Sequence, residues 1–109
     1  MANEEVINRI DNLVKNNDVV LFMKGSSEMP LCGFSARVAS ILRHLKLNYL
    51  DVNILEDNDM RQGIKDYSDW PTIPQLYIKG IFIGGCDIVK DMFEKGELQK
   101  LLTDKQLIS

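Results

Sequence analysis

Short apolar strands that alternate with amphipathic helices predict an α/β fold built on a mixed sheet. Three observations support this prediction. The first half of the chain alternates between helical and strand-like spacing of apolar residues, which favours parallel pairing of its strands. The last two expected strands are separated by only two residues, which favours an antiparallel hairpin. The 109 residues, 45% of them apolar, suit one hydrophobic core, so we expect a single domain over residues 1–109.

The first half is expected to hold two helices and two strands. Apolar residues recur at helical spacing over residues 6–14, after a helix cap at Asn3. Residues 19–23 form a continuous apolar run, which is typical of a strand buried on both faces. A loop then leads to a second amphipathic helix over residues 35–45 and to a strand over residues 49–52.

The third helix is expected to begin at Asp57 or Asn58, either of which can cap it, and to reach Tyr67. A loop with two prolines follows. The next elements are two strands joined by a tight turn, at residues 75–78 and 81–83.

The last part of the chain is expected to be helical. Asp87 can cap a helix that runs through Phe93, and Gly96 is suited to stop it. A shorter helical stretch is expected over residues 97–102. The predicted order is therefore α-β-α-β-α-β-β-α, followed by this short stretch.

Composition excludes several classes of function. The net charge of −3 argues against binding to a nucleic-acid backbone, and no apolar run approaches the roughly 20 residues of a membrane helix. Residues 1–5 lack the character of a signal or transit peptide, so we expect a cytoplasmic protein or a matured organellar form.

Two cysteines and one histidine are too few for a four-ligand zinc site in one chain. The thiols are therefore inert, redox-active or shared with another molecule.

Cys32 is the strongest candidate for chemistry. It lies just before the second predicted helix, where unpaired N–H groups and the helix dipole stabilise a thiolate. Lys24, at the end of the preceding strand, adds positive potential. A buried core thiol is the alternative, although the surrounding Pro30 and Gly33 favour a loop.

No second cysteine follows Cys32 at the spacing of a dithiol motif. Ser35 occupies that position, and its hydroxyl is suited to cap the helix. Cys32 therefore needs an outside thiol, or Cys86, for disulfide exchange. His44 lies within the second helix, away from these residues, and we assign it no chemistry.

Three motifs, in order, resemble those of the monothiol glutaredoxins. Cys32-Gly33-Phe34-Ser35 is similar to the active-site tetrapeptide of that family, and Lys24 lies eight positions before the cysteine, as it does there. The resemblance extends from about Val6 to Leu102. One departure is Ser27, where many members have proline. The other two motifs are Trp70-Pro71-Thr72-Ile73-Pro74-Gln75 and Gly84-Gly85-Cys86-Asp87.

The resemblance implies a thioredoxin-like fold, with helices on both faces of a four-stranded sheet. It implies glutathione as ligand and a [2Fe–2S] cluster that bridges two chains, with Cys32 as both the reactive thiol and the cluster ligand. The implied partners are a second copy in a cluster-dependent homodimer, BolA-type proteins and iron–sulfur apoproteins. The implied glutathione-binding residues are Lys24, Arg61, Thr72, Ile73, Pro74, Gly85, Cys86 and Asp87.

These residue types suit glutathione, which carries two carboxylates, one ammonium and a thiol. Lys24 can meet the glycyl carboxylate, and by resemblance Arg61 assists it. Pro74 has no N–H and directly precedes a strand, so a turn or a cis bond is expected there. In the resembling family this bond is cis, which presents the backbone of Ile73 to the ligand. Trp70 either flanks the site or is a packed surface aromatic.

The twin glycines Gly84 and Gly85 allow a close approach of the backbone. Cys86 and Asp87 follow at an expected helix N-terminus, which favours a carboxylate such as that of the γ-glutamyl group. The Asp87 side chain can pair with the γ-glutamyl ammonium, cap the helix, or do both. For Cys86 we expect the backbone N–H to matter more than the sulfur.

Two functions remain open at this point. In the first, Cys32 and a bound glutathione from each of two chains supply the four thiolates of a [2Fe–2S] cluster for storage or transfer. Cys32 and Cys86 from each chain form an alternative set of four. In the second, the protein is a glutathione-dependent thiol–disulfide oxidoreductase, of weak activity at most, in which Cys32 attacks glutathione mixed disulfides. The loop over residues 25–31 is longer than a minimal turn between a strand and a helix, so it can displace Cys32 from the position needed for this attack. This observation counts against the second function.

Overall fold

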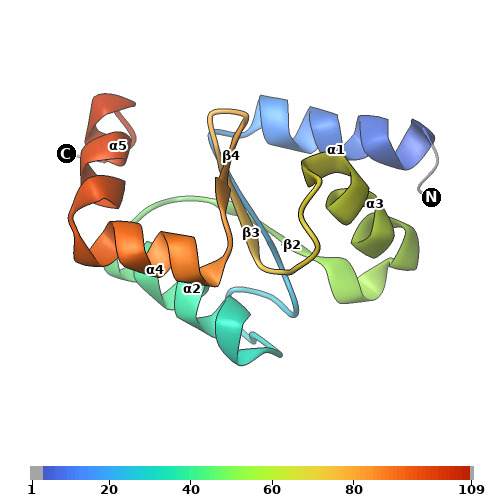
Figure 1. Ribbon diagram of the computed structural model, residues 1–109, viewed down its shortest axis with the longest axis horizontal. Helices are drawn as coiled ribbons and strands as arrows, with labels where there is room; N and C mark the ends of the chain where they lie inside the picture. The colour runs from blue at the N-terminus through green and yellow to red at the C-terminus, as the bar shows by residue number, and fades with distance from the viewer. Residues whose placement is uncertain (1–3, 109) are drawn as a thin grey trace.

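The computed structural model describes residues 4–108, and it arranges four strands and six helical segments in the predicted order (Figure 1). The strands and helices agree with the sequence prediction to within two residues at most ends, and a short 3₁₀ turn is added after the second strand. The elements are α1 (Glu4–Asn16), β1 (Val19–Met23), α2 (Gly33–His44), β2 (Leu50–Asn53), η1 (Ile54–Glu56), α3 (Asn58–Ser68), β3 (Gln75–Ile78), β4 (Ile81–Gly84), α4 (Cys86–Glu94) and α5 (Glu97–Asp104).

The four strands form one mixed sheet in the order β2-β1-β3-β4. β1 pairs in parallel with β2 and antiparallel with β3, and β3 pairs antiparallel with β4. The parallel pairing of the early strands and the terminal hairpin are therefore confirmed. β1 is central and all of its residues are buried, as its continuous apolar run predicts.

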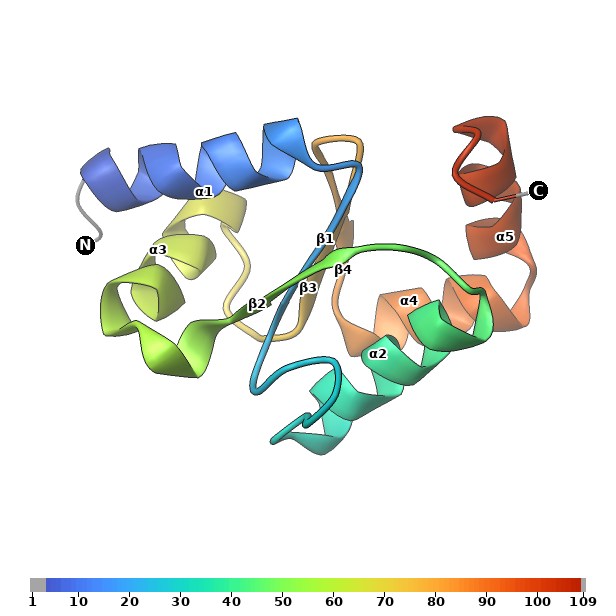
Figure 2. The ribbon, with the colours of Figure 1, turned by 180° about the vertical axis from the view of Figure 1, so that it is seen from behind.

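Helices cover both faces of the sheet, which confirms the expected fold class. α1 packs with α3 on one face, and α2 packs with α4 on the other (Figures 1 and 2). Successive side chains of a strand point to opposite faces. Accordingly, Val20 and Phe22 join the core under α1 and α3, while Leu21 and Met23 join the core under α2 and α4. α5 packs against α4.

The helix starts correct two details of the sequence prediction. Asp57 caps α3 as expected, and its carboxylate accepts hydrogen bonds from two backbone N–H groups. Asp87 does not cap α4, because Gly85 is the N-cap and Asp87 lies inside the first turn. Ser35 does not cap α2, because that helix begins at Gly33, after Cys32. The expected cap at Asn3 lies outside the described residues.

None of the helices between residues 4 and 108 combines the length and the apolar character needed to cross a bilayer.

Candidate functional site

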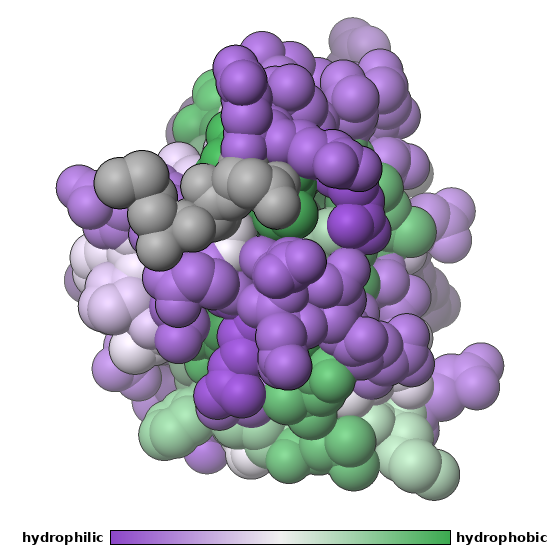
Figure 3. Space-filling view, turned by 90° about the vertical axis from the view of Figure 1, so that its right-hand side faces the viewer, coloured by the Kyte–Doolittle hydropathy of each residue, from purple (hydrophilic) through white to green (hydrophobic). Residues whose placement is uncertain are grey.

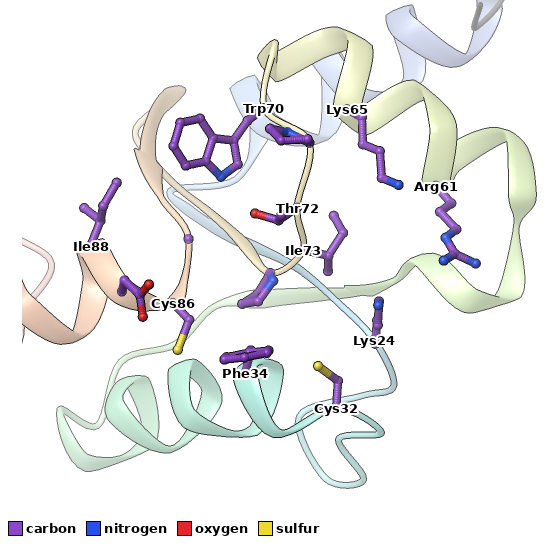
Figure 4. Close-up of a pocket in the computed structure, with 14 residues that line it drawn as sticks. Lys24, Cys32, Phe34, Arg61, Lys65, Trp70, Thr72, Ile73, Cys86 and Ile88 are labelled. Atoms are coloured by element: carbon purple, nitrogen blue, oxygen red, sulfur yellow. The ribbon is translucent and has the colours of Figure 1, made fainter.

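One pocket of about 470 Å³ opens where β1, α2 and α4 approach the loop before β3. Figure 4 shows Cys32 and Phe34 at its base, Trp70 at the far end, and basic side chains on one wall. Its volume lies within the range of small-molecule sites. The lining residues are Lys24, Cys32, Phe34, Arg61, Lys65, Trp70, Pro71, Thr72, Ile73, Pro74, Gly85, Cys86, Asp87 and Ile88.

All residues proposed from the sequence as the reactive thiol or the ligand site line this pocket. They come from five parts of the chain that only the fold brings together: the end of β1, the start of α2, α3, the loop before β3, and the start of α4. His44, to which no chemistry was assigned, lies outside the pocket, is exposed, and packs edge-on against Phe93. The individual ligand roles stay predictions.

Cys32 lies at the N-cap of α2 and is partly exposed, so it is not a core thiol. The backbone N–H of Ser35, donating to the sulfur, lowers the pKa of Cys32 below that of an ordinary thiol, and Phe34 N–H and the Lys24 charge act in the same direction. The thiol is therefore activated by the start of its own helix.

The side chain of Ser35 has a different role from the predicted cap. It is fully buried, and its hydroxyl accepts a hydrogen bond of 3.1 Å from the Lys24 backbone N–H. This bond ties the start of α2 to the end of β1. Cys32 and Lys24 are therefore held in a fixed relation by a residue that does not itself line the pocket.

The loop before Cys32 is fixed by the neighbouring strand β2. Asn53 Oδ1 accepts from the Gly25 backbone N–H at 3.0 Å, and Asp51 Oδ2 accepts from the Ser27 N–H at 2.8 Å. Gly25 has a positive φ of 89°, and a Cβ there would lie 2.4 Å from the Met29 carbonyl oxygen. The turn therefore requires glycine at this position.

Cys86 differs from Cys32 in both burial and reactivity. It is the first residue of α4, is only 9% exposed, and its burial raises the pKa of its thiol. The two thiols of the chain are both free, but only Cys32 has the features of a nucleophile.

This contrast predicts the order in which the thiols react. We expect iodoacetamide to alkylate Cys32 well before Cys86 at neutral pH, because the thiolate is the reacting form. Lys24→Gln should move the pH–rate profile of Cys32 toward higher pH, since it removes a cation that helps to lower the pKa of this thiol. Peptide mass spectrometry over a pH series measures both effects. Lys100→Gln, on α5, is the matched control, and an equal shift in both variants would contradict the prediction.

Three basic side chains form one wall of the pocket. Lys24 extends from the end of β1, while Arg61 and Lys65 lie one turn apart on α3 (Figure 4). Asp87 lines the same pocket from α4. The pocket therefore carries an excess of positive charge within an acidic protein, which suits an anionic ligand with an additional cationic group.

The loop before β3 supplies the backbone wall. The Ile73–Pro74 bond is cis, which agrees with the sequence expectation. The buried Gln75 side chain fixes this loop by two hydrogen bonds. Its Nε2 donates to the carbonyl oxygen of Trp70 at 3.1 Å and to that of Thr72 at 3.2 Å. The backbone at Thr72 and Ile73 is therefore presented to the pocket by hydrogen bonds from β3.

Gly85 allows this loop and α4 to meet. A Cβ at Gly85 would lie 3.2 Å from the Pro74 carbonyl oxygen and 3.6 Å from Trp70 Nε1. Trp70 is 38% exposed, lines the pocket and packs on Phe82, so it both flanks the site and is a packed surface aromatic. A side chain at position 85 would push the proline loop away from α4.

Large apolar side chains are exposed in the loop before Cys32 and at the start of α2. Met29, Leu31 and Phe34 are 69%, 62% and 62% exposed, which is unusual for large apolar residues so close together in the chain. Figure 3 shows apolar surface along the lower edge of the molecule, where Figure 1 places the loop before α2 and the start of that helix. These three exposed side chains form an apolar rim close in the chain to the thiol of Cys32.

Sequence reasoning assigned no role in the site to Lys65, Gln75 or Ile88. Lys65 follows Arg61 by four positions on a predicted helix, and that spacing was enough to place both on one face. Gln75 was visible as a polar residue at the start of an apolar strand, but its partners are set by the fold. Ile88 carries no signal in the sequence that distinguishes it from a core residue.

The fold and site together define a thioredoxin-like domain with one activated thiol beside a pocket whose charged side chains are mostly basic. The Glutaredoxin family model matches residues 19–83. A probable monothiol glutaredoxin 2 of Rickettsia prowazekii is 50% identical over 104 residues, which cover 95% of this chain and 97% of the relative. This chain belongs to the glutaredoxin family, and its features are those of the monothiol type.

Further comparisons agree with this assignment. The chloroplastic monothiol glutaredoxin-S14 of Arabidopsis thaliana is 55% identical over 91 residues, which cover 84% of this chain and 53% of that protein. A truncated mutant of Trypanosoma brucei 1-C-Grx1 superposes with a TM-score of 0.86 at 43% identity, covering 98% of this chain and 94% of the other. A buckwheat glutaredoxin–glutathione complex gives a TM-score of 0.84 at 26% identity, covering 98% and 99%.

Proposed function

We propose that this protein binds glutathione and, together with it, holds a [2Fe–2S] cluster between two chains for storage or transfer. The observation that carries the proposal is the pairing of one activated thiol, Cys32, with a pocket of mixed charge on the same face. The buckwheat relative, described as a glutaredoxin–glutathione complex, supports glutathione as the ligand.

Glutathione matches the charges of the pocket in order. Its glycyl carboxylate pairs with Lys24, Arg61 and Lys65, and its γ-glutamyl ammonium pairs with Asp87. The γ-glutamyl carboxylate meets the backbone N–H groups at the start of α4. The cysteinyl part pairs with the backbone of Ile73, which leaves the glutathione sulfur near Cys32.

The cluster requires four thiolates, and the sequence offers two cysteines per chain. Cys32 fits a cluster ligand because it is partly exposed and its pKa is lowered, whereas the buried Cys86 has a raised pKa. When bound, the cluster supplies an exchangeable iron–sulfur unit. The protein residues orient glutathione so that its sulfur and that of Cys32 form one pair, and a second chain provides the other.

The apolar rim of Met29, Leu31 and Phe34 is suited to contact whatever approaches Cys32. A second copy of the chain covers it in the cluster-bound homodimer, and a BolA-type protein or an iron–sulfur apoprotein covers it during transfer. Burial of such side chains contributes roughly 25 cal/mol per Å² of apolar surface.

The lowered pKa of Cys32 also favours a second candidate function, the reduction of glutathione mixed disulfides. The Cys32 thiolate attacks the glutathione sulfur and releases the client thiolate. A second glutathione thiolate then attacks the new disulfide, freeing Cys32 and leaving as glutathione disulfide. Turnover of a glutathionylated substrate comparable to that of a dithiol glutaredoxin would make this the principal function.

Anaerobic reconstitution with iron and sulfide, with and without glutathione, tests the main proposal. With glutathione we expect the absorption bands of thiolate-ligated iron and a native mass of two chains, two glutathiones and one cluster. Removal of glutathione should abolish the bands and return the protein to a monomer, because half the ligands leave. Stable bands on protein freed of glutathione would contradict the proposed ligand set.

A further inference from the structure

A series of four aromatic rings leads from the pocket to Asp11 on α1. Trp70 packs on Phe82 with ring centroids 6.0 Å apart, Phe82 on Tyr77 at 5.3 Å, and Tyr77 on Tyr67 at 6.0 Å. The Tyr67 hydroxyl donates a hydrogen bond of 2.8 Å to Asp11 Oδ1 on α1. Tyr77, Tyr67 and Phe82 belong to the core beneath α1 and α3, whereas Cys32 is the N-cap of α2, which packs on the other core.

The two ends of this series of rings differ in a way that suits electron transfer. One end is open to an oxidant, and the other has a proton acceptor. Trp70 lines the pocket and is partly exposed, so a one-electron oxidant can reach it (Figure 4). Tyr67, at the other end, has a carboxylate within proton-transfer distance. Tyr77, between them, is buried, and the hydrogen-bonding partners of its hydroxyl in the described part of the protein are neutral: it donates to the Gln75 amide oxygen at 3.3 Å and also interacts with the Ser68 hydroxyl. Only the last tyrosine is therefore equipped to lose its proton.

We propose that the Trp70–Phe82–Tyr77–Tyr67 chain is a relay that moves oxidising equivalents away from the pocket, with Asp11 as the proton acceptor. A small radical oxidant, such as the carbonate radical anion, removes one electron from Trp70. One electron then passes from Tyr67 to the Trp70 radical cation, and the Tyr67 proton passes to the Asp11 carboxylate. The products are neutral Trp70, a Tyr67 phenoxyl radical and protonated Asp11.

Charge balances in this step, because a cation and a carboxylate are converted into three neutral groups. Phe82 is too difficult to oxidise to hold the charge, so it serves as the medium between Trp70 and Tyr77. A soluble one-electron reductant, such as ascorbate, then reduces the phenoxyl radical at Tyr67, and Asp11 returns the proton. The result of one cycle is that an oxidant is consumed without a lasting change at the pocket.

The protonation states suit the two roles. Burial and the neighbouring Asp11 raise the pKa of Tyr67 to about 12, so the phenol carries its proton at rest. The hydrogen bond from Tyr67, together with Lys15 at 3.1 Å, holds the pKa of Asp11 below its usual value, so the acceptor is a carboxylate. Loss of an electron makes a phenol strongly acidic, which drives the proton across this short bond.

The sequence allows a clear test, because Trp70 is the only tryptophan of the chain. Flash photolysis with a ruthenium tris-bipyridyl oxidant, on the full chain with Cys32 alkylated, follows the tryptophan and tyrosyl radical absorptions over time. We expect the tryptophan radical to decay as a tyrosyl radical appears, at a rate independent of protein concentration. Failure to form any tyrosyl radical in the unmodified sequence would overturn the proposal.

Three variants identify the donor. Tyr67→Phe should lose the tyrosyl signal, and Asp11→Asn should lose it too, although an asparagine oxygen can still accept the hydrogen bond. Tyr49→Phe is the matched control, since Tyr49 packs in the other core, and it should behave as the unmodified protein does. An unchanged signal in either Tyr67→Phe or Asp11→Asn, or its loss in Tyr49→Phe, would overturn the relay. Circular dichroism of each variant confirms that it is folded.

Discussion

Cys32→Ser is expected to remove cluster assembly completely while leaving the fold intact. The substitution deletes the only thiol with a lowered pKa, so no bands of thiolate-ligated iron should form in anaerobic reconstitution with glutathione. Serine is a favoured helix N-cap residue, and Cys32 is the N-cap of α2, so the helix should persist. The free energy of unfolding should change by no more than about 0.5 kcal/mol. Absorbance and denaturant unfolding measure the two effects.

Cys86→Ser is the matched control for this experiment. Its thiol is buried and has a raised pKa, so we expect full retention of the cluster. Placing a hydroxyl in this buried position should reduce stability by about 1 kcal/mol. Loss of the cluster from folded Cys86→Ser protein would instead support the set of Cys32 and Cys86 from each chain.

Gln75→Leu is expected to weaken both the fold and the binding of glutathione. Leucine leaves the Trp70 and Thr72 carbonyl oxygens and the Tyr77 hydroxyl without the partner that Gln75 provides. We expect a loss of about 3 kcal/mol in the free energy of unfolding. Glutathione affinity should fall about tenfold, the equivalent of 1.4 kcal/mol, because the loop that presents Ile73 loses its support. Urea unfolding and titration calorimetry measure these changes.

Gln99→Leu separates the two effects. Gln99 Nε2 also donates to a backbone carbonyl, that of Phe93, but it lies on α5 and does not line the pocket. It should cost less stability, since Gln99 Oε1 is buried without a hydrogen-bond partner in the described part of the chain. Glutathione affinity should be unchanged. Equal loss of affinity in both variants would mean that the Gln75 effect is a general consequence of destabilisation.

The elements with strong local signals were predicted well from the sequence. The apolar run over residues 19–23 indicated the central strand, and the two-residue turn indicated the terminal hairpin. Asp57 was predicted as a cap and is one. In each case the signal comes from neighbouring residues in the sequence, which determine the conformation of the backbone in their own segment.

The parts that were not predicted depend on contacts between distant segments. Ser35 was expected to cap a helix because serine commonly does so, but its hydroxyl bonds to the backbone of Lys24, eleven positions earlier. Asp87 was expected to cap α4, but the glycine before Cys86 takes that place without a side-chain signal. Lys65 and Gln75 became recognisable as site residues only once α3 and β3 were placed around the pocket.

The three basic side chains on one wall of the pocket affect the stability of the protein without its ligand. The salt bridges in the described part of the chain engage other basic residues, so Lys24, Arg61 and Lys65 line the pocket as like charges without a salt-bridge partner among those residues. Because like charges repel, we expect a carboxylate ligand that pairs with this wall to stabilise the folded protein. Ligand occupancy and thermal resistance are therefore linked: simple salts should partly replace the ligand by screening, and a dilute, salt-free preparation should be the least robust form of the molecule.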